Sequence, residues 1–266
     1  MILWRDGAHD ARENMARDAR LLAACESGAL ARPVLRLFQF APAGITLGSS
    51  QSPEAELDLP RLEGAGIVWA VRPTGGRAIW HDEEWTFSLT APLGPEGWAP
   101  DPTAAYARTC GMLAVALRAL GVPVELSAGS ARGVGRPRGG AEAAPPCFAS
   151  TARYELTLDG RKFAGIAQRR RGTALLQQGS LLLGDSHLRL ADWARLAEER
   201  RPAVREALAG ATAHAGPWLG ARAPLERLEQ AVAAGWPDCE RLGPADSDAF
   251  LGTLPVVDVR AGATGA

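Results

Sequence analysis

Lysine is almost absent from this chain of 266 residues. Of its 29 basic residues, only Lys162 is a lysine, and the others are arginine. An ammonium group is a compact point charge on a flexible stem, and its pKa changes readily on burial, so a guanidinium does not replace it at every site. Lys162 is therefore a candidate functional residue, with chance in an arginine-rich composition as the alternative.

Cysteines, long apolar runs and net charge are scarce as well. The four cysteines are far apart and form no CxxC pair, which argues against a zinc site and against a disulfide framework. No apolar run approaches the roughly 18 residues of a transmembrane helix, and the first residues are too polar for a secretory signal. The net charge of −1 gives no general attraction to nucleic acid or membranes. We expect a reduced, cytoplasmic protein without metal, nucleic acid or membrane partners.

The apolar content of 47% is sufficient for a packed core, and the residue patterns alternate between strands and helices. Strands are expected over residues 33–40, 45–47, 67–72, 85–90, 123–126, 153–158, 161–168 and 173–183. Helices are expected over residues 10–27, 57–64, 102–120, 186–200, 202–209, 224–235 and 246–251. The interpretation is an α+β fold with helices on a mixed, largely antiparallel sheet. We expect one domain over residues 1–260 that is helical from about residue 186.

Four expectations concern burial. The largely apolar run over residues 67–72 predicts a buried strand. In strand 85–90 large apolar residues alternate with Thr and Ser, which predicts a strand with one buried face. Asn14 and Asp18 are spaced i,i+4 and share one face of helix 10–27, where we expect a solvated stripe or a local hydrogen bond. Cys110 falls on the apolar face of helix 102–120 and is expected to be a core thiol.

Lys162 falls in a predicted β-hairpin. Asp159-Gly160 is a favoured two-residue turn, and it places Thr157 opposite Lys162. Glu155 is then the diagonal neighbour of Lys162. The apolar residues of the hairpin share one face, which we expect to join the core: Tyr154, Leu156, Leu158 and Phe163.

Two short stretches after the strand at 67–72 could bind a ligand. In Thr74-Gly75-Gly76-Arg77, the paired glycines allow close approach of the backbone and free N–H groups for an anion or carbonyl. The stretch matches neither a Walker A loop nor a dinucleotide-binding fingerprint, and a simple tight turn is the alternative. His81-Asp82 follows, without any GxSxG motif in the chain, so a structural role is the alternative for this histidine.

Cys147 is a candidate nucleophile. It follows a run without periodicity over residues 127–146, which makes an accessible thiol plausible on sequence grounds. A nearby ammonium such as that of Lys162 favours the thiolate by lowering the cysteine pKa. An ordinary half-buried cysteine is the alternative.

Five motifs, in this order, resemble the superfamily of biotin/lipoate protein ligases and octanoyl/lipoyl transferases. They are ENMARD (13–18), ITLGSSQ (45–51), VRPTGGRAIWHDEEWTFSL (71–89), CFASTARYELTLDGRKFAGIAQRR (147–170) and LLQQGSLLL (175–183). The resemblance is strongest to the branch of octanoyltransferases that use a cysteine, and it implies the catalytic-domain fold of the ligases. One departure is Gln178, because the family usually has histidine there.

The resemblance implies octanoyl transfer from acyl carrier protein to a lysine of a lipoyl-domain protein such as the glycine cleavage H protein, without a cofactor. It makes Cys147 the acyl-accepting nucleophile and Lys162 its catalytic partner. The implied substrate-binding residues are Arg72, Thr74, Gly75, Gly76, Arg77, His81, Gly165 and Gln168. An octanoyl amidotransferase between lipoyl domains and an ATP-dependent lipoate-protein ligase are the alternatives.

Arginine clusters could steer the acidic carrier and lipoyl-domain partners that the resemblance implies. A solvated surface is the alternative interpretation. These clusters are Arg132, Arg136 and Arg138, and the run 169–171.

Overall fold

A computed structural model describes residues 1–127 and 154–255. Its centre is a six-stranded sheet with the order β10-β11-β6-β2-β1-β12. The strands are β1 (Ile2–His9), β2 (Val34–Phe40), β6 (Glu84–Pro92), β10 (Ala164–Arg171), β11 (Ala174–Leu182) and β12 (Glu240–Leu242). Strands β2, β1 and β12 are parallel, whereas β2, β6, β11 and β10 pair antiparallel. The prediction of a mixed, largely antiparallel sheet is confirmed.

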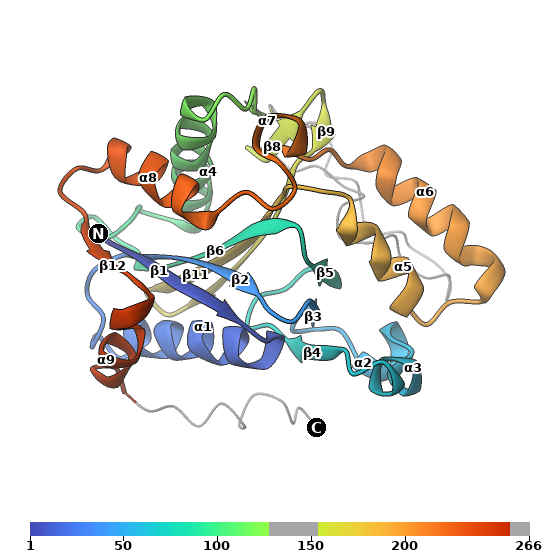
Figure 1. Ribbon diagram of the computed structural model, residues 1–266. Helices are drawn as coiled ribbons and strands as arrows, with labels where there is room; N and C mark the ends of the chain where they lie inside the picture. Colours follow the sequence, from blue (N-terminus) through green and yellow to red (C-terminus); the bar gives the residue numbers. More distant parts are fainter. Residues whose placement is uncertain (128–153, 256–266) are drawn as a thin grey trace.

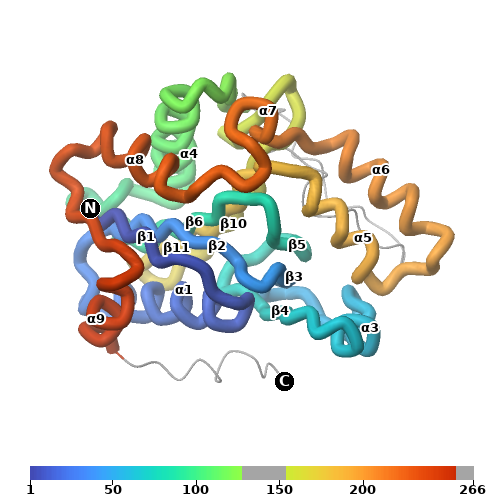
Figure 2. The backbone as a smooth tube through the Cα atoms, in the orientation of Figure 1, coloured from blue at the N-terminus to red at the C-terminus, as the bar shows by residue number. Residues whose placement is uncertain are grey.

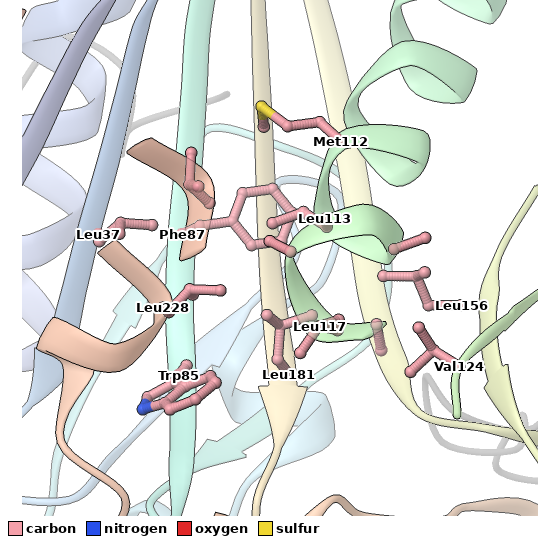
Figure 3. Close-up of a cluster of buried hydrophobic side chains, with 14 of the residues drawn as sticks. Leu37, Trp85, Phe87, Met112, Leu113, Leu117, Val124, Leu156, Leu181 and Leu228 are labelled. Carbon is pink, nitrogen blue, oxygen red and sulfur yellow. The ribbon is translucent and has the colours of Figure 1, made fainter. Parts of the chain in front are cut away.

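Helices cover both faces of this sheet. Helix α1 (Ala11–Glu26) lies on one face, and α4 (Pro102–Ala119) and α8 (Leu225–Gly235) lie on the other (Figures 1 and 2). The main apolar core fills the space between the sheet and the second pair, where Phe87 and Leu181 meet Leu113, Leu117 and Leu228 (Figure 3). The expected helices over 10–27 and 102–120 are therefore present.

The start of α4 follows its sequence signal. The carboxylate of Asp101 accepts hydrogen bonds from the backbone N–H groups of Thr103 and Ala104, and Pro102 occupies the first turn. At the other end, Gly121 has a φ of +83°, which glycine adopts without the strain of a side chain.

Strand β6 is buried on both faces, so the prediction of one exposed face is wrong. Its large residues, including Trp85 and Phe87, enter the main core. Ser88 and Thr90 face the opposite way and are 0% exposed, because α1 covers them. The hydroxyl of Ser88 donates a hydrogen bond of 2.7 Å to Asp18 of α1. The Thr and Ser residues therefore line a polar layer within the protein.

The sequence patterns do not predict β1 or β12. In β1, Asp6 and Gly7 interrupt the apolar run and resemble turn residues. Gly7 instead lies at a bulge with a φ of +96°, and Asp6 is buried. Strand β12 has only three residues, and Glu240 pairs with Ile2 at the far end of the sequence.

Two three-stranded sheets carry the candidate site residues, in the orders β4-β3-β5 and β7-β8-β9. Their strands are β3 (Gly44–Leu47), β4 (Val68–Val71), β5 (Ile79–His81), β7 (Glu125–Leu126), β8 (Leu156–Leu158) and β9 (Arg161–Lys162). Two short helices follow β3, α2 (Pro53–Glu56) and α3 (Leu59–Gly64). Strand β4 lies at an edge with Val71 39% exposed, so the expected burial of this strand is wrong.

The hairpin of β8 and β9 has the predicted register. Asp159 and Gly160 both have positive φ, at 49° and 72°, and Thr157 pairs with Lys162. The prediction of one continuous return strand over 161–168 is wrong. The strand is interrupted at Phe163, whose side chain enters the main core, and β10 then joins the six-stranded sheet.

Short helices follow β11. They are η2 (Ser186–Arg189), α5 (Leu190–Trp193), η3 (Glu198–Arg200), α6 (Arg201–Ala211), α7 (Gly216–Leu219), η4 (Pro244–Asp246) and α9 (Ser247–Gly252). The single helix expected over 186–200 is wrong, because Ala194 and Ala197 are extended and Ala194 bridges to Leu57. Helices α6, α8 and α9 confirm the other three C-terminal predictions. Within residues 1–127 and 154–255, no helix has the length and apolar character needed to cross a membrane.

Candidate active site

A small cavity lies where α1 meets the ends of several strands. Its volume is ≈ 30 Å³. Of the residues that the sequence nominates for substrate binding, Arg72, His81 and Gly165 line it. The other lining residues are Met15, Phe38, Phe40, Thr46, Ile79, Thr86, Ile166, Ala167, Gln178, Gly179 and Ser180. The cavity thus has mainly apolar walls and a cluster of polar groups from β3, β5, β6 and β11.

Arg72 organises the neighbouring glycine loop. Its buried guanidinium donates hydrogen bonds to the carbonyl oxygens of Gly75, at 2.7 Å, and Arg77, at 2.8 Å. Gly48 closes on the loop from the other side, where a Cβ atom would lie 2.0 Å from the carbonyl oxygen of Gly76. Backbone contacts therefore fix the Thr74–Arg77 loop from two sides, and only glycine fits at position 48.

His81 lies at the polar end of the cavity. Its Nε2 is 2.7 Å from the hydroxyl of Thr46, and its Nδ1 is 2.7 Å from Oε1 of Glu84. The imidazole stacks on Phe40 with a distance of 3.9 Å between ring centroids. These three contacts fix both the plane and the rotation of the ring.

Glu84 lies at the centre of this polar cluster, where one of its oxygen atoms contacts three side chains. Besides His81, the hydroxyls of Thr86 and Ser180 donate to the same Oε1 atom, at 2.7 and 3.1 Å. Three donors on one oxygen suit an ionised carboxylate, which accepts and does not donate. The Nδ1 atom of His81 then carries the proton, and Nε2 accepts the hydroxyl proton of Thr46.

A buried charge cluster lies behind the cavity, beneath α1. Arg36 of β2 is 0% exposed, and its guanidinium contacts Asp6 at 2.7 Å, Asp18 at 2.8 Å and Asn14 at 2.7 Å. Asn14 and Asp18 are themselves fully buried, so the expected solvated stripe is wrong. Burial alone would raise the pKa of Asp6, but the attraction of Arg36, with its hydrogen bonds, holds that pKa below the usual range.

Gln178 joins this charge cluster to the glycine loop. Its amide nitrogen donates to Asp18 at 2.6 Å, and its amide oxygen accepts from the hydroxyl of Thr74 at 2.7 Å. A neutral histidine could make both bonds, because one ring nitrogen donates and the other accepts. The glutamine therefore makes both of the hydrogen bonds that a histidine, which the resemblance leads us to expect here, could make.

Gln178→His should leave the free energy of unfolding within about 1 kcal/mol of wild type, because both hydrogen bonds can be kept. Gln178→Glu should cost about 1–3 kcal/mol, because the donor to Asp18 is lost and two carboxylates then adjoin. Chemical denaturation at neutral pH measures both changes. Gln230→Glu, at an exposed position of α8, is the matched control. Equal stabilities for the two Gln178 variants would contradict the described role of the amide.

Lys162 lies outside the cavity wall described above. Its ammonium is 2.9 Å from Oε1 of Glu155, and both side chains are nearly buried, at 5% and 6% exposure. The diagonal pairing predicted for these residues is confirmed. The backbone carbonyl of Lys162 accepts from the N–H of Ala213, so the segment after α6 helps to hold this position.

The remaining nominated residues have separate positions. Arg77 forms an ion pair of 3.4 Å with Glu56 of α2, on the side of the loop away from the cavity. Gln168 is exposed on β10 and accepts a hydrogen bond from Gln177. Among the residues that the structure describes, no group of three or more His, Cys, Asp or Glu side chains could hold a metal ion.

The cysteines differ in their surroundings. Cys147 lies outside the described residues, as do Arg132, Arg136 and Arg138. Burial raises the pKa of the Cys25 thiol to about 11 and that of Cys110 to about 12, so both are protonated at neutral pH. The expected core position of Cys110 is confirmed, and Cys239 is half-buried.

Sequence reasoning misses Glu84, Thr46 and the cluster around Arg36. The sequence does contain a signal for the cluster around Arg36. Arg36 is the one charged residue in an apolar strand, and a buried charge requires a counterion. The i,i+4 pair of Asn14 and Asp18 could have supplied it. Nothing local indicates that Thr46 meets His81, because that contact depends on how β3 pairs with β5.

Known proteins share this architecture. The chain aligns with a lipoate protein ligase from the archaeon Thermoplasma acidophilum, solved in a study of a bipartite ligase and its E2 lipoyl domain. The TM-score is 0.67 at 17% identity, covering 94% of this chain and 89% of that protein. At this identity the likeness establishes the fold alone.

Sequence comparison gives nearer relatives. Octanoyltransferase LipM of Moorella thermoacetica is 38% identical over 189 residues, which are 68% of this chain and 65% of that protein, slightly under two thirds of its length. Octanoyltransferase LipM of Kyrpidia tusciae is 31% identical over 252 residues, covering 92% of this chain and 91% of that protein. Residues 10–205, which include every residue lining the cavity, match the family described as the lipoyl protein ligase A/B catalytic domain. The chain therefore belongs to the lipoyl protein ligase A/B catalytic domain family.

Proposed function

We propose that this protein is an octanoyltransferase of lipoate biosynthesis. It would move an octanoyl group from acyl carrier protein to a lysine of a lipoyl-domain protein such as the glycine cleavage H protein. The observation that carries the proposal is the similarity to two octanoyltransferases, at 38% and 31% identity. The donor thioester is already activated, so the proposed transfer requires neither ATP nor a metal ion.

The cavity supports this proposal by its chemistry. Apolar walls with a few fixed polar groups are typical of sites that orient a small apolar substrate. The volume of ≈ 30 Å³ is smaller than an octanoyl chain, so the wall must adapt when the chain enters. Met15 is suited to this because methionine has flexible torsions, and Phe40 lies at the end of β2. Arg72 and His81 would then lie beside the acyl group, with Gly165 opposite.

The first step in this proposal forms an acyl-enzyme. The thiolate of Cys147 attacks the carbonyl carbon of octanoyl-carrier protein, the new C–S bond forms, and the carrier leaves as its thiolate. The Lys162 ammonium favours the Cys147 thiolate and stabilises the oxyanion of the tetrahedral intermediate. Backbone N–H groups of the Gly75-Gly76 loop, which Thr74 and Arg77 flank, are further candidate donors.

The second step forms the product amide. The neutral ε-amine of the acceptor lysine attacks the thioester carbon and the C–S bond breaks, and the Cys147 sulfur leaves and takes up the proton that the amine loses. Gln168, exposed on β10, is proposed to contact one of the two protein substrates at the mouth of the site. An amidotransferase would follow the same two steps with an octanoylated lipoyl domain as donor.

Intact-mass measurement after incubation with octanoyl-acyl carrier protein tests the proposal. Wild-type protein is expected to gain the mass of one octanoyl group, and Cys147→Ala is expected to gain none. Cys239→Ala is the matched control and should form the adduct, because Cys239 is a half-buried thiol outside the site. An adduct on Cys147→Ala would contradict the mechanism. Adduct formation only from an octanoylated lipoyl domain would favour the amidotransferase, and product formation only with octanoate and ATP would favour the ligase.

A further inference from the structure

A second and larger cavity lies on the other side of the segment that ends in β5. Its volume is ≈ 380 Å³. Ile79 lines the small cavity of the candidate active site, whereas Ala78 and Arg77 line the second one. Successive residues of an extended chain face opposite sides, which accounts for the opposite positions of Ala78 and Ile79, and Arg77 reaches the second cavity from the loop before them. The segment 77–79 is therefore a thin partition between the two cavities.

The walls of the second cavity are mostly small and apolar. They come from α5 and α6, which pack together at one end of the molecule (Figure 1), and from α2 and the partition. Alanines at 191, 203 and 207 leave the space open, and Leu190 and Val204 add apolar surface. The volume is within the range of about 300–1,000 Å³ that is usual for small-molecule sites.

The second cavity also has a charged rim. Arg195 and Arg200 line it together with Glu199, while Arg77 and Glu56 form an ion pair with each other. Among the described residues, no carboxylate forms an ion pair with Arg195 or Arg200. The side chain of Arg195 donates instead to the backbone carbonyl of Glu54. The rim therefore carries a net positive charge.

Helix α6 adds to this charge. It begins at Arg201 and has 11 residues, and its first-turn residues Ala203 and Val204 line the cavity. Pro202 has no N–H and the N–H of Arg201 donates to the carbonyl of Glu198, so this terminus contributes chiefly the partial positive charge of the helix dipole. An anionic group at the rim would meet this helix terminus as well as the arginine side chains.

We propose that the second cavity binds the phosphopantetheine arm through which an acyl carrier protein holds its thioester. This inference rests on the proposed function, because it concerns the donor of that reaction. The arm is slender, and its methylene and gem-dimethyl groups match the small apolar walls, while its two amides and hydroxyl can face the open side of the cavity. Its phosphate end matches the rim at Arg195 and Arg200. With the acyl chain in the small cavity and the arm in the large one, the thioester would pass around the edge of the segment that separates the two cavities.

Donors of different length test this assignment. Ala203→Trp should fill the cavity, and it should lower kcat/KM for octanoyl-acyl carrier protein and for octanoyl-coenzyme A by at least about tenfold. Transfer from the short octanoyl thioester of N-acetylcysteamine should stay within about twofold of wild type, because this donor lacks most of the arm. Ala209→Trp, on an exposed part of α6 outside the cavity, is the matched control and should transfer normally from all three donors.

Two results would overturn the assignment in this assay. Equal losses with long and short donors would mean that the cavity serves the acyl chain or the fold, and no loss with any donor would mean that it is unused.

Free 4′-phosphopantetheine gives a readout that is independent of turnover. Calorimetry should show binding to wild type and to Ala209→Trp, and weaker binding to Ala203→Trp and to Arg200→Glu. If the wild type transfers octanoyl from none of the donors, the proposed function is wrong. If the wild type does not bind phosphopantetheine at millimolar concentration, the cavity assignment is wrong, whatever the transfer assay shows.

Discussion

Lys162→Met is expected to abolish measurable octanoyl transfer and to destabilise the protein. Loss of a positive group that stabilises a thiolate and an oxyanion typically costs about 10²–10³ in rate. Independently, the variant leaves the nearly buried carboxylate of Glu155 without the ammonium that lies 2.9 Å from it. Breaking a buried ion pair in this way costs about 3–5 kcal/mol of unfolding free energy. Single-turnover transfer and chemical denaturation measure the two effects separately.

Two further variants separate the effect of Lys162 on the transfer reaction from its effect on stability. Lys162→Met combined with Glu155→Gln should recover most of the lost stability, because the buried carboxylate that loses its ammonium partner is itself replaced by a neutral amide. Its transfer rate should remain as low as that of the single variant. Recovery of transfer in the double variant would show that Lys162 serves the fold alone. Lys162→Arg should also be inactive despite its charge, because a planar guanidinium does not fit a site shaped for an ammonium.

Arg36→Met is expected to have the largest effect on stability. The guanidinium of Arg36 is fully buried, contacts Asp6 and Asp18, and stacks on Phe38 at 3.9 Å. Without it, two buried carboxylates adjoin, and Arg17 remains beside only one of them, Asp6. The cost should reach or exceed about 3–5 kcal/mol, enough to unfold a marginal protein at 37 °C. Thermal unfolding measured by circular dichroism checks this.

The sign of the pH dependence provides a second test of the Arg36 cluster. The pKa of Asp6 is lowered in the folded protein. Ionised Asp6 therefore stabilises the wild type at pH values above its usual pKa of about 3.9. This stabilisation is lost as the pH falls through the folded-state pKa. In Arg36→Met, the burial that raises the pKa of Asp6 is no longer offset by Arg36, so acidification from neutral pH should raise stability. A parallel decrease in both proteins would contradict this account. Asp6→Asn with Asp18→Asn should partly rescue Arg36→Met.

Features with local signals could be predicted from the sequence. The N-cap at Asp101 defines α4, and the turn Asp159-Gly160 fixes the pairing of Thr157 with Lys162 and hence the contact with Glu155. In each case the residues that determine the structure are neighbours along the chain.

Features that depend on distant pairing could not be predicted. Whether Ser88 faces water or another element depends on α1, which packs on β6. The hydrogen bond between Ser88 and Asp18 of α1 joins residues that are 70 positions apart in the sequence. Glu84 accepts hydrogen bonds from both Thr86 and Ser180 through one oxygen atom, and this depends on the pairing of β6 with β11. A polar residue in an alternating strand is therefore ambiguous until its neighbours in space are known.

The pairing of β1 with β12 has a consequence for synthesis of the chain. Ile2 pairs with Glu240, and the indole of Trp4 donates to the hydroxyl of Ser247, at a sequence separation of 243 residues. At roughly 5–20 residues per second, this edge of β1 waits tens of seconds for its partner to be translated. During that time an apolar strand edge is open to association with other chains. Nascent chains that stop short of β12 are thus expected to be the aggregation-prone species of this protein.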